Sequence, residues 1–179
     1  PYKIWISEIM MQQTQVATVI PYYNKFIDTY PDLQSLSKAS LDELVLLWSG
    51  LGYYRRIKNI FLAAQIISKK FDYEFPKDYE DILSLPGIGK TTASAICTFS
   101  GFSHRAILDG NVKRILRRYF NISYENNSKT EKILWEKSIF VQYAFSFWQK
   151  AIIQNCHNNN QSTIMTMVVQ IRHPRVILT

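Results

Sequence analysis

The sequence is poor in cysteine and has no long apolar run, and these shortages exclude several classes of protein. Two cysteines among 179 residues, Cys97 and Cys156, support neither a disulfide framework nor a metal cluster of the usual spacing. No stretch approaches the roughly 18 uninterrupted apolar residues of a membrane span. The first residues show neither an initiator methionine nor a signal-peptide pattern, so we expect a fragment without its natural N-terminus. An intracellular protein with no membrane partner is the simplest expectation.

Basic side chains are what the sequence has in excess. Lysine and arginine outnumber aspartate and glutamate by 21 − 14 = 7, which gives a formal net charge of +7. Such an excess suits a polyanionic partner, bound with salt-sensitive and largely sequence-independent affinity. Solvated helix faces are the alternative for any single basic pair. The clusters are Arg55-Arg56 with Lys58, Lys69-Lys70, Lys113-Arg114 and Arg117-Arg118.

Apolar residues recur at helical spacing along most of the chain, as at Ile57, Ile60 and Ala64. No convincing two-residue alternation appears, so we predict an all-α fold, in one medium domain or two small lobes. Ser40 and Glu43 form a capping-box pattern, which predicts the start of a short helix. Further helices are expected at residues 78–83, 90–100, 111–120 and 129–140.

A proline-glycine turn lies between the predicted helices 78–83 and 90–100. Its residues are Leu85-Pro86-Gly87-Ile88-Gly89-Lys90. The two glycines let the backbone approach a ligand without a Cβ in the way. The amides that begin the next helix favour an anion such as a phosphate. The pattern predicts a helix-hairpin-helix that clamps a phosphate, with Lys90 as a contact, whereas an ordinary turn is the alternative for this segment alone.

Two carboxylates have surroundings that suit opposite roles. Glu8 lies among apolar and amide side chains in a predicted helix, which would raise its pKa and suit a general acid or base. The exposed stripe of an amphipathic helix is an equally good interpretation of Glu8. Asp109 begins the predicted helix 111–120, where amides and the helix dipole favour the ionised form, although a plain N-cap is common there. Two carboxyl groups whose surroundings give them different pKa values are typical of a site in which one acts as an acid and the other as an anion. The sequence does not show that Glu8 and Asp109 lie near each other.

Amide and aromatic side chains form a second group of candidates. Gln12, Gln13 and Thr14 could read base edges or fill the space left by a displaced base. A second segment puts rings beside guanidiniums, which suits stacking on bases and gripping phosphate. Tyrosines packed on a core with their hydroxyls outward are the ordinary alternative. The residues of this segment are Leu51, Gly52, Tyr53, Tyr54, Arg55 and Arg56.

Four blocks of the sequence resemble signature blocks of the MutY-type adenine DNA glycosylases, which belong to the helix-hairpin-helix superfamily and are related to endonuclease III. The blocks are residues 1–16, 47–54, 85–90 and 107–114, and the resemblance extends to about residue 147. It implies a six-helix barrel lobe with a second helical lobe that is incomplete in this chain. It also implies a monomer, cytoplasmic or at the nucleoid, that binds double-stranded DNA and flips out adenine mispaired with 8-oxoguanine or guanine. The adenine would then be removed by hydrolysis of its N-glycosidic bond.

The resemblance also implies roles for single residues. Glu8 would protonate adenine N7 and then assist the incoming water, Asp109 would stabilise the positive sugar left behind, and Asn111 would orient the site. The residues implied at the DNA are Met11 against adenine, Gln13 and Tyr53 near the opposite base, and Gly87 and Gly89 with a monovalent cation at a phosphate, together with Gln12, Thr14, Leu51, Tyr54, Arg56, Lys90, Thr91 and Lys113.

Thr91 separates two branches of the superfamily. In the glycosylase-lyases related to endonuclease III, a lysine two residues after the second hairpin glycine forms a Schiff base with the sugar. Thr91 occupies that place here, which favours a monofunctional glycosylase. Two alternatives stay open: an endonuclease III-like glycosylase-lyase for oxidised pyrimidines, and a non-catalytic helix-hairpin-helix DNA-binding fragment.

The C-terminal part of the chain departs from the family. Relatives carry a four-iron four-sulfur cluster held by four cysteines, and this chain lacks them, so we expect no cluster and no metal other than the monovalent cation at the hairpin backbone. We hypothesise that a frameshift or a misassembled gene end produced the last residues, and a real shortened paralogue is the competing explanation. The expected divisions are 1–20 as the start of the cluster-side lobe with the helix of Glu8, 21–108 as the six-helix lobe, 109–156 as the rest of the second lobe, and 157–179 as a disordered tail.

Overall fold

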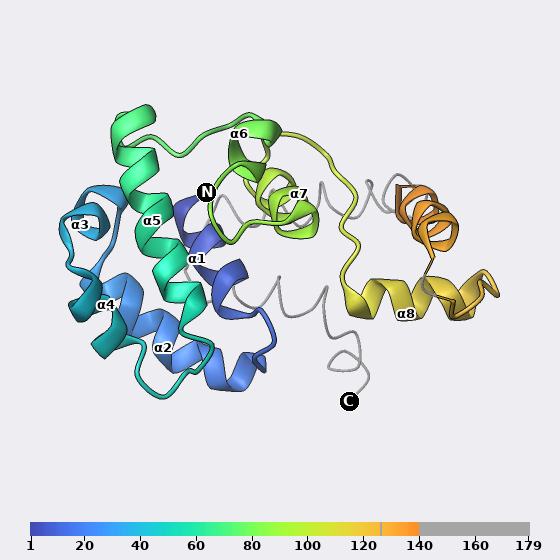
Figure 1. The fold of residues 1–179 in the computed structure, drawn as a ribbon, viewed down its shortest axis with the longest axis horizontal. Helices are drawn as coiled ribbons and strands as arrows, with labels where there is room; N and C mark the ends of the chain where they lie inside the picture. The colour runs from blue at the N-terminus through green and yellow to red at the C-terminus, as the bar shows by residue number, and fades with distance from the viewer. Residues whose placement is uncertain (126, 140–179) are drawn as a thin grey trace. The chain divides into compact units, whose positions relative to one another are not determined.

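The computed structural model describes residues 1–125 and 127–139, whose regular elements are all helices, and this confirms the predicted all-α class (Figure 1). The chain divides into two compact units, Pro1–Ser103 and His104–Thr179. The expected division at residues 20, 108 and 156 stays a prediction. The tail expected at 157–179 lies outside the described residues.

Helix α1 forms the centre of the first unit. Eight of its nine residues are buried, and it packs against α2, α5 and α7, between α5 and α7 in Figure 1. Aromatic rings fill the surrounding core, among them Phe26 and Trp48, which meet edge to face at 6.3 Å between centroids. The helices of this unit are α1 Tyr2–Met10, α2 Val16–Thr29, α3 Leu33–Lys38, α4 Leu41–Leu47, α5 Arg55–Lys70, α6 Tyr79–Leu83 and α7 Lys90–Phe99.

Short helices α3 and α4 begin at capping boxes. The Ser40 hydroxyl accepts a hydrogen bond from the Glu43 amide at 3.2 Å, and the Glu43 carboxylate accepts one from the Ser40 amide at 2.7 Å. This confirms the capping box that the sequence predicts. Asp32 and Ser35 form a second box at the start of α3. Hydrogen bonds from these amides and hydroxyls lower the pKa values of Asp32 and Glu43.

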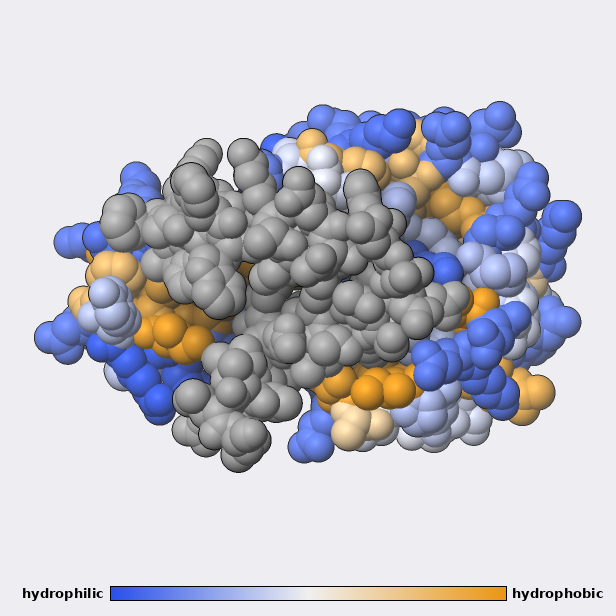
Figure 2. Space-filling view, turned by 180° about the vertical axis from the view of Figure 1, so that it is seen from behind, coloured by the Kyte–Doolittle hydropathy of each residue, from blue (hydrophilic) through white to orange (hydrophobic). Residues whose placement is uncertain are grey.

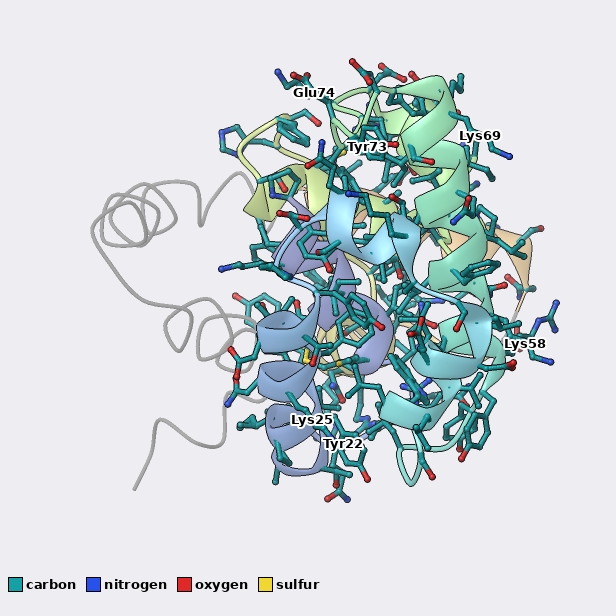
Figure 3. The ribbon with its side chains drawn as sticks, turned by 90° about the vertical axis from the view of Figure 1, so that its left-hand side faces the viewer. Tyr22, Lys25, Lys58, Lys69, Tyr73 and Glu74 are labelled. Carbon is teal, nitrogen blue, oxygen red and sulfur yellow. The ribbon has the colours of Figure 1, made fainter. Side chains whose placement is uncertain are left out.

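Helix α5 carries one buried and one exposed face. Its apolar stripe includes Ile57, Ile60 and Ile67, against which α3 and α4 pack. On the other side Lys58 and Lys69 point outward, as Figure 3 shows. The basic cluster at the start of the helix is therefore divided between the surface and the interior, because Arg56 is buried.

The second unit contains α8, Gly110–Tyr119, and a helical stretch at residues 128–139. Leu108, Leu116 and Leu134 form its small core, and the Ser138 hydroxyl donates to the Ile107 carbonyl at 2.9 Å. Large apolar side chains stay exposed on α8, where Tyr119 is 79% exposed. Figure 2 shows hydrophobic areas among hydrophilic ones on the face of the molecule that it draws. The described part of this unit therefore buries only one side of α8.

Candidate functional site

The hairpin between α6 and α7 has the tight geometry that its glycines predict. Gly87 has φ +79, which is the left-handed region. A Cβ built on Gly87 would lie 2.8 Å from the Cβ of Asn59 on α5, so the hairpin backbone is pressed against that helix. Gly89 and Lys90 are exposed at the start of α7. The amides of the first turn of α7 are therefore placed where an anion can approach them.

Glu8 is completely buried within α1. It is 0% exposed, and its helix neighbours Trp5 and Ile9 are buried with it. The alternative that Glu8 lies on an exposed stripe is therefore wrong. A carboxyl that water does not reach is suited to holding and transferring a proton.

Residues 11–15, which connect α1 to α2, form the first of two candidate loops, each of which holds a left-handed residue other than glycine, as do the segments at Asp72-Tyr73 and Asn121. Gln13 adopts the left-handed conformation, with φ 57, and is exposed. Met11 is 5% exposed, and Gln12 and Thr14 are half-buried. The Gln12 side-chain amide donates to the Gly87 carbonyl at 3.3 Å, which joins this loop to the hairpin.

Residues 49–54, between α4 and α5, form the second loop. Tyr53 is also left-handed, with φ 49, and is 58% exposed. Tyr54 is exposed as well, whereas Leu51 is buried. Left-handed residues other than glycine are each strained by roughly 1–2 kcal/mol, and such strain is often found at functional sites. Gln13 and Tyr53 are thus exposed and strained, and they are the two residues that the family resemblance places near the base opposite adenine.

Arg56 does not have the exposed position that phosphate contact requires, and this corrects its expected role. It is 6% exposed, and its guanidinium donates to backbone carbonyls of both loops. Burial lowers the pKa of the guanidinium from its ordinary value, although an arginine stays protonated in proteins. Arg56 is therefore an internal cation bound by the protein's own backbone.

Asp109 lies in the second unit as the N-cap of α8. Its carboxylate accepts hydrogen bonds from the amides of Asn111 at 3.0 Å and Val112 at 2.8 Å. The plain N-cap expected as the alternative is thus present, and the side chain is half-buried. Lys113 is paired with Glu131, with Nζ 2.8 Å from the carboxylate. Glu8 and Asp109 belong to different units, and their meeting in one site stays a prediction.

Metal ligands and membrane spans are absent from the part of the chain that the structure describes. In residues 1–125 and 127–139, no three His, Cys, Asp or Glu side chains gather as a ligand set. Cys97 is buried in α7, and Cys156 lies outside those residues. Two cysteines do not fit a cluster that needs four thiolates. Among the described helices none is long and apolar enough to cross a membrane.

Residues 6–138 match the family described as the HhH-GPD superfamily of base excision DNA repair proteins. The chain belongs to this superfamily. The matched range contains Glu8, the hairpin and Asp109, so the candidate residues of both units lie within the shared domain.

Relatives of this HhH-GPD chain include proteins named adenine DNA glycosylase. One from Buchnera aphidicola subsp. Baizongia pistaciae is 52% identical over 155 residues, which are 86% of this chain and 44% of that protein. The human protein of that name is 41% identical over 128 residues, which are 71% of this chain and 23% of its own length. The chain thus spans less than half the length of these relatives.

Solved structures support the same fold. A thermostable thymine-DNA glycosylase is 30% identical and aligns with a TM-score of 0.70 over 77% of this chain and 64% of its own. An endonuclease III trapped as a covalent intermediate with DNA is 20% identical, with a TM-score of 0.68 over 81% of this chain and 73% of its own. At 20% identity, the similarity to the endonuclease III structure shows the fold alone.

Two residues that contact the candidate segments, Asn59 and Arg56, were not assigned these contacts from the sequence. Asn59 packs against the hairpin at Gly87. This contact joins segments that are distant in the sequence, and no sequence pattern in either segment predicts it. Arg56 did leave a signal, because it precedes Ile60, Ala63 and Ile67 on the apolar stripe of α5 at helical spacing. A charge on such a stripe predicts a buried side chain with internal partners.

Proposed function

We propose that the chain is an adenine DNA glycosylase that acts on double-stranded DNA as a monomer. It hydrolyses the N-glycosidic bond of adenine mispaired with 8-oxoguanine or guanine. The observation that carries this proposal is the complete burial of Glu8 on α1, inside the range shared with base excision repair proteins. The choice of adenine as the substrate base is supported by relatives of that name at 50% to 53% identity.

The proposed reaction needs one proton donor and one anion. Once adenine is flipped out of the duplex, the Glu8 carboxyl gives its proton to adenine N7. The C1′–N9 bond then breaks and its electron pair leaves with the base. The Glu8 carboxylate takes a proton from a water molecule whose oxygen bonds to C1′. Asp109 stabilises the positive charge on the sugar between these steps, and Asn111 orients the site.

The DNA is held by three exposed segments of the first unit. The amides at Gly89 and Lys90 bind a backbone phosphate. Backbone groups of Gly87 and Gly89 would hold a monovalent cation, whose charge would favour the same phosphate. Gln13 and Tyr53 enter the stack beside the base opposite adenine. Exposure and left-handed backbone at these two residues support this role.

Thr91 makes the proposed enzyme monofunctional. It lies in the first turn of α7, two residues after Gly89, and its hydroxyl cannot form the Schiff base by which a lysine would cleave the strand. The product is therefore an abasic site in an uncut strand.

Single-turnover assays test this proposal. The full chain is incubated with duplexes that contain adenine opposite 8-oxoguanine, adenine opposite guanine, or thymine glycol opposite adenine. We expect strand breaks with the two adenine duplexes, and only after alkali. Breaks without alkali on thymine glycol would instead indicate a glycosylase-lyase, and binding without any breaks would indicate a non-catalytic fragment.

A substitution at Glu8 tests its assignment. Glu8→Gln keeps the shape of the side chain and removes the transferable proton, so base removal should fall by about 100-fold or more, the size of a general acid-base contribution. Binding to the mispaired duplex should be retained. Glu74→Gln is the matched control, because Glu74 is exposed in the loop after α5. An unchanged single-turnover rate in Glu8→Gln contradicts the assignment.

A further inference from the structure

The guanidinium of Arg56 joins two loops that are distant in sequence. Nη1 donates to the carbonyl of Ile9 at 3.3 Å, to that of Met10, and to that of Gln12 at 2.8 Å. Nη2 donates to the carbonyls of Leu51 at 3.3 Å and Gly52 at 3.1 Å. One nitrogen thus binds the end of α1 and the loop that follows it, while the other binds the loop before α5.

Arginine is the side chain that suits this place. The carbonyls at the end of α1 have no partner within the helix and form its negative end, which favours a cation. A planar guanidinium presents two separated NH₂ groups at once, whereas the ammonium of lysine is a single point. Only a forked cation can therefore reach both loops from one position on α5.

Aromatic rings complete the surroundings of the guanidinium. Its central carbon lies 5.3 Å from the centroid of the buried Trp48 ring and 5.2 Å from that of Tyr53. The Trp48 indole also donates to the Gly52 carbonyl at 3.0 Å. Arg56 thus contacts the exposed Tyr53 ring directly and its loop through the backbone.

Gln12 extends the connection to the hairpin. Its backbone carbonyl accepts from Arg56, and its side-chain amide donates to the Gly87 carbonyl. The loops at 11–15 and 49–54 and the hairpin are therefore linked by hydrogen bonds through one buried cation. Gln13, which follows Gln12, and Tyr53 are the exposed left-handed residues of these loops.

We propose that Arg56 is a positioning residue for recognition of the mispair. It locks the two loops together and so sets the spacing at which Gln13 and Tyr53 enter the DNA, without touching the DNA itself. The role rests on the proposed function, since it assumes that these loops meet the base pair. The competing view is that Arg56 only stabilises the fold.

Arg56→Lys and Arg56→Met, made in the full chain, separate the two views. The matched control is Arg55→Lys with Arg55→Met, because Arg55 is the neighbouring residue on α5 and is exposed. Circular dichroism and melting curves identify a temperature at which each variant is folded. Hydrogen exchange of residues 11–15 and 49–54 is then measured, together with dissociation constants for duplexes holding adenine opposite 8-oxoguanine and for fully paired duplexes.

Arg56→Lys should raise exchange in both loops together. It should also reduce the preference for the mispair by about tenfold, the equivalent of about 1.4 kcal/mol, while affinity for the paired duplex stays within about twofold. Arg56→Met should have the same effects to a larger extent, because methionine carries no charge. The positive charge in Arg56→Lys should therefore keep part of the loop protection and part of the mispair preference. Arg55→Met should instead weaken binding to both duplexes equally, as loss of an exposed cation does.

Several results would overturn the proposal. Exchange that rises in one loop alone, or in neither, would show that Arg56 does not couple them. Looser loops with an unchanged mispair preference, or failure of both Arg56 variants to fold at any temperature, would show that its role is structural. A wild-type chain without any mispair preference would refute the proposed function, whereas the exchange measurement would still decide whether Arg56 couples the loops.

Discussion

Gly87→Ala should destabilise the first unit strongly, and the structure allows its magnitude to be worked out. At φ +79 an alanine is strained by roughly 1–2 kcal/mol. Its Cβ would also lie 2.7 Å from Asn59 Nδ2 and 2.8 Å from Asn59 Cβ. The amide can rotate away, but the Cβ of Asn59 is fixed to the backbone of α5, so the hairpin and the helix must separate. Overpacking of this kind adds roughly 1–3 kcal/mol.

The expected total for Gly87→Ala is a loss of about 2–5 kcal/mol in the free energy of unfolding, by addition of the strain and the overpacking. Urea denaturation with a common slope measures it, and the melting temperature should fall by about 10 °C or more in a unit of this size. Gly89→Ala is the matched control, because Gly89 has φ −97 and an added Cβ meets nothing within 4 Å. It should cost at most about 1 kcal/mol as a change of N-cap.

Changes at Asn59 separate strain from collision in the Gly87→Ala variant. Asn59→Ala should not restore stability, because it keeps the Cβ that the new methyl group meets at 2.8 Å. Asn59→Gly removes that Cβ. In the Gly87→Ala background it should therefore recover the stability lost to the collision but not the stability lost to backbone strain. A glycine inside α5 itself costs about 1 kcal/mol, which reduces the recovery. Equal stability of Gly87→Ala and the wild type would refute the reasoning, as would equal damage from Gly89→Ala.

Two further predictions concern pH. Hydrogen bonds lower the pKa values of Asp32 and Glu43 in the folded state, so their stabilisation is present above the unfolded pKa values near 4 and is lost as pH falls through the lowered values. Melting temperatures measured from about pH 6 to pH 3 should therefore fall less steeply in the double variant Asp32→Asn/Glu43→Gln than in the wild type. An equal fall of the melting temperature in both proteins would argue against the two capping boxes. Burial raises the pKa of Tyr23 to about 12, so its stabilisation is complete below the unfolded pKa near 10 and is lost as pH rises through 12. Alkaline absorbance titration of Tyr23→Phe against the wild type should show one tyrosine fewer at that pH; loss of a tyrosine that titrates near pH 10 instead would contradict its burial.

The features that the sequence predicted correctly are local ones. The capping box at Ser40 and Glu43, the turn at Gly87 and the start of α8 after Asp109 each depend on residues a few positions apart, and all three are present. Local chemistry selects these structures, since a cap or a turn is closed by its own neighbours. Their bounds differ from the predicted ones by about one residue, as helix ends commonly do.

The features that the sequence did not reveal depend on contacts between distant segments. Arg55 and Arg56 are adjacent basic residues, yet one is exposed and the other lies under two loops. The difference is a matter of helical phase on α5, which places position 56 toward α1. The position of Glu8 could not be predicted from the sequence for the same reason, because its burial depends on how other helices pack against α1, among them α2, α5 and α7. The apolar stripe of α5 indicates that position 56 faces inward, but the carbonyls that Arg56 binds belong to distant segments and are not marked in the sequence.

Glu8 and Arg56 are both ionisable side chains buried in the first unit, and helix α1 connects their roles. Glu8 precedes Ile9 and Met10, whose carbonyls Arg56 binds, so the cation holds the last turn of the helix that carries the proposed proton donor. Loosening that turn should move the carboxyl relative to the flipped base, and a displacement of about 1 Å can reduce a rate by about 100-fold. Arg56→Lys should therefore lower both selectivity and single-turnover rate, whereas Glu8→Gln lowers the rate alone. A variant of Arg56 that loses selectivity at full rate would show that the end of α1 is fixed by its packing in the core, and that Arg56 acts only on the loops.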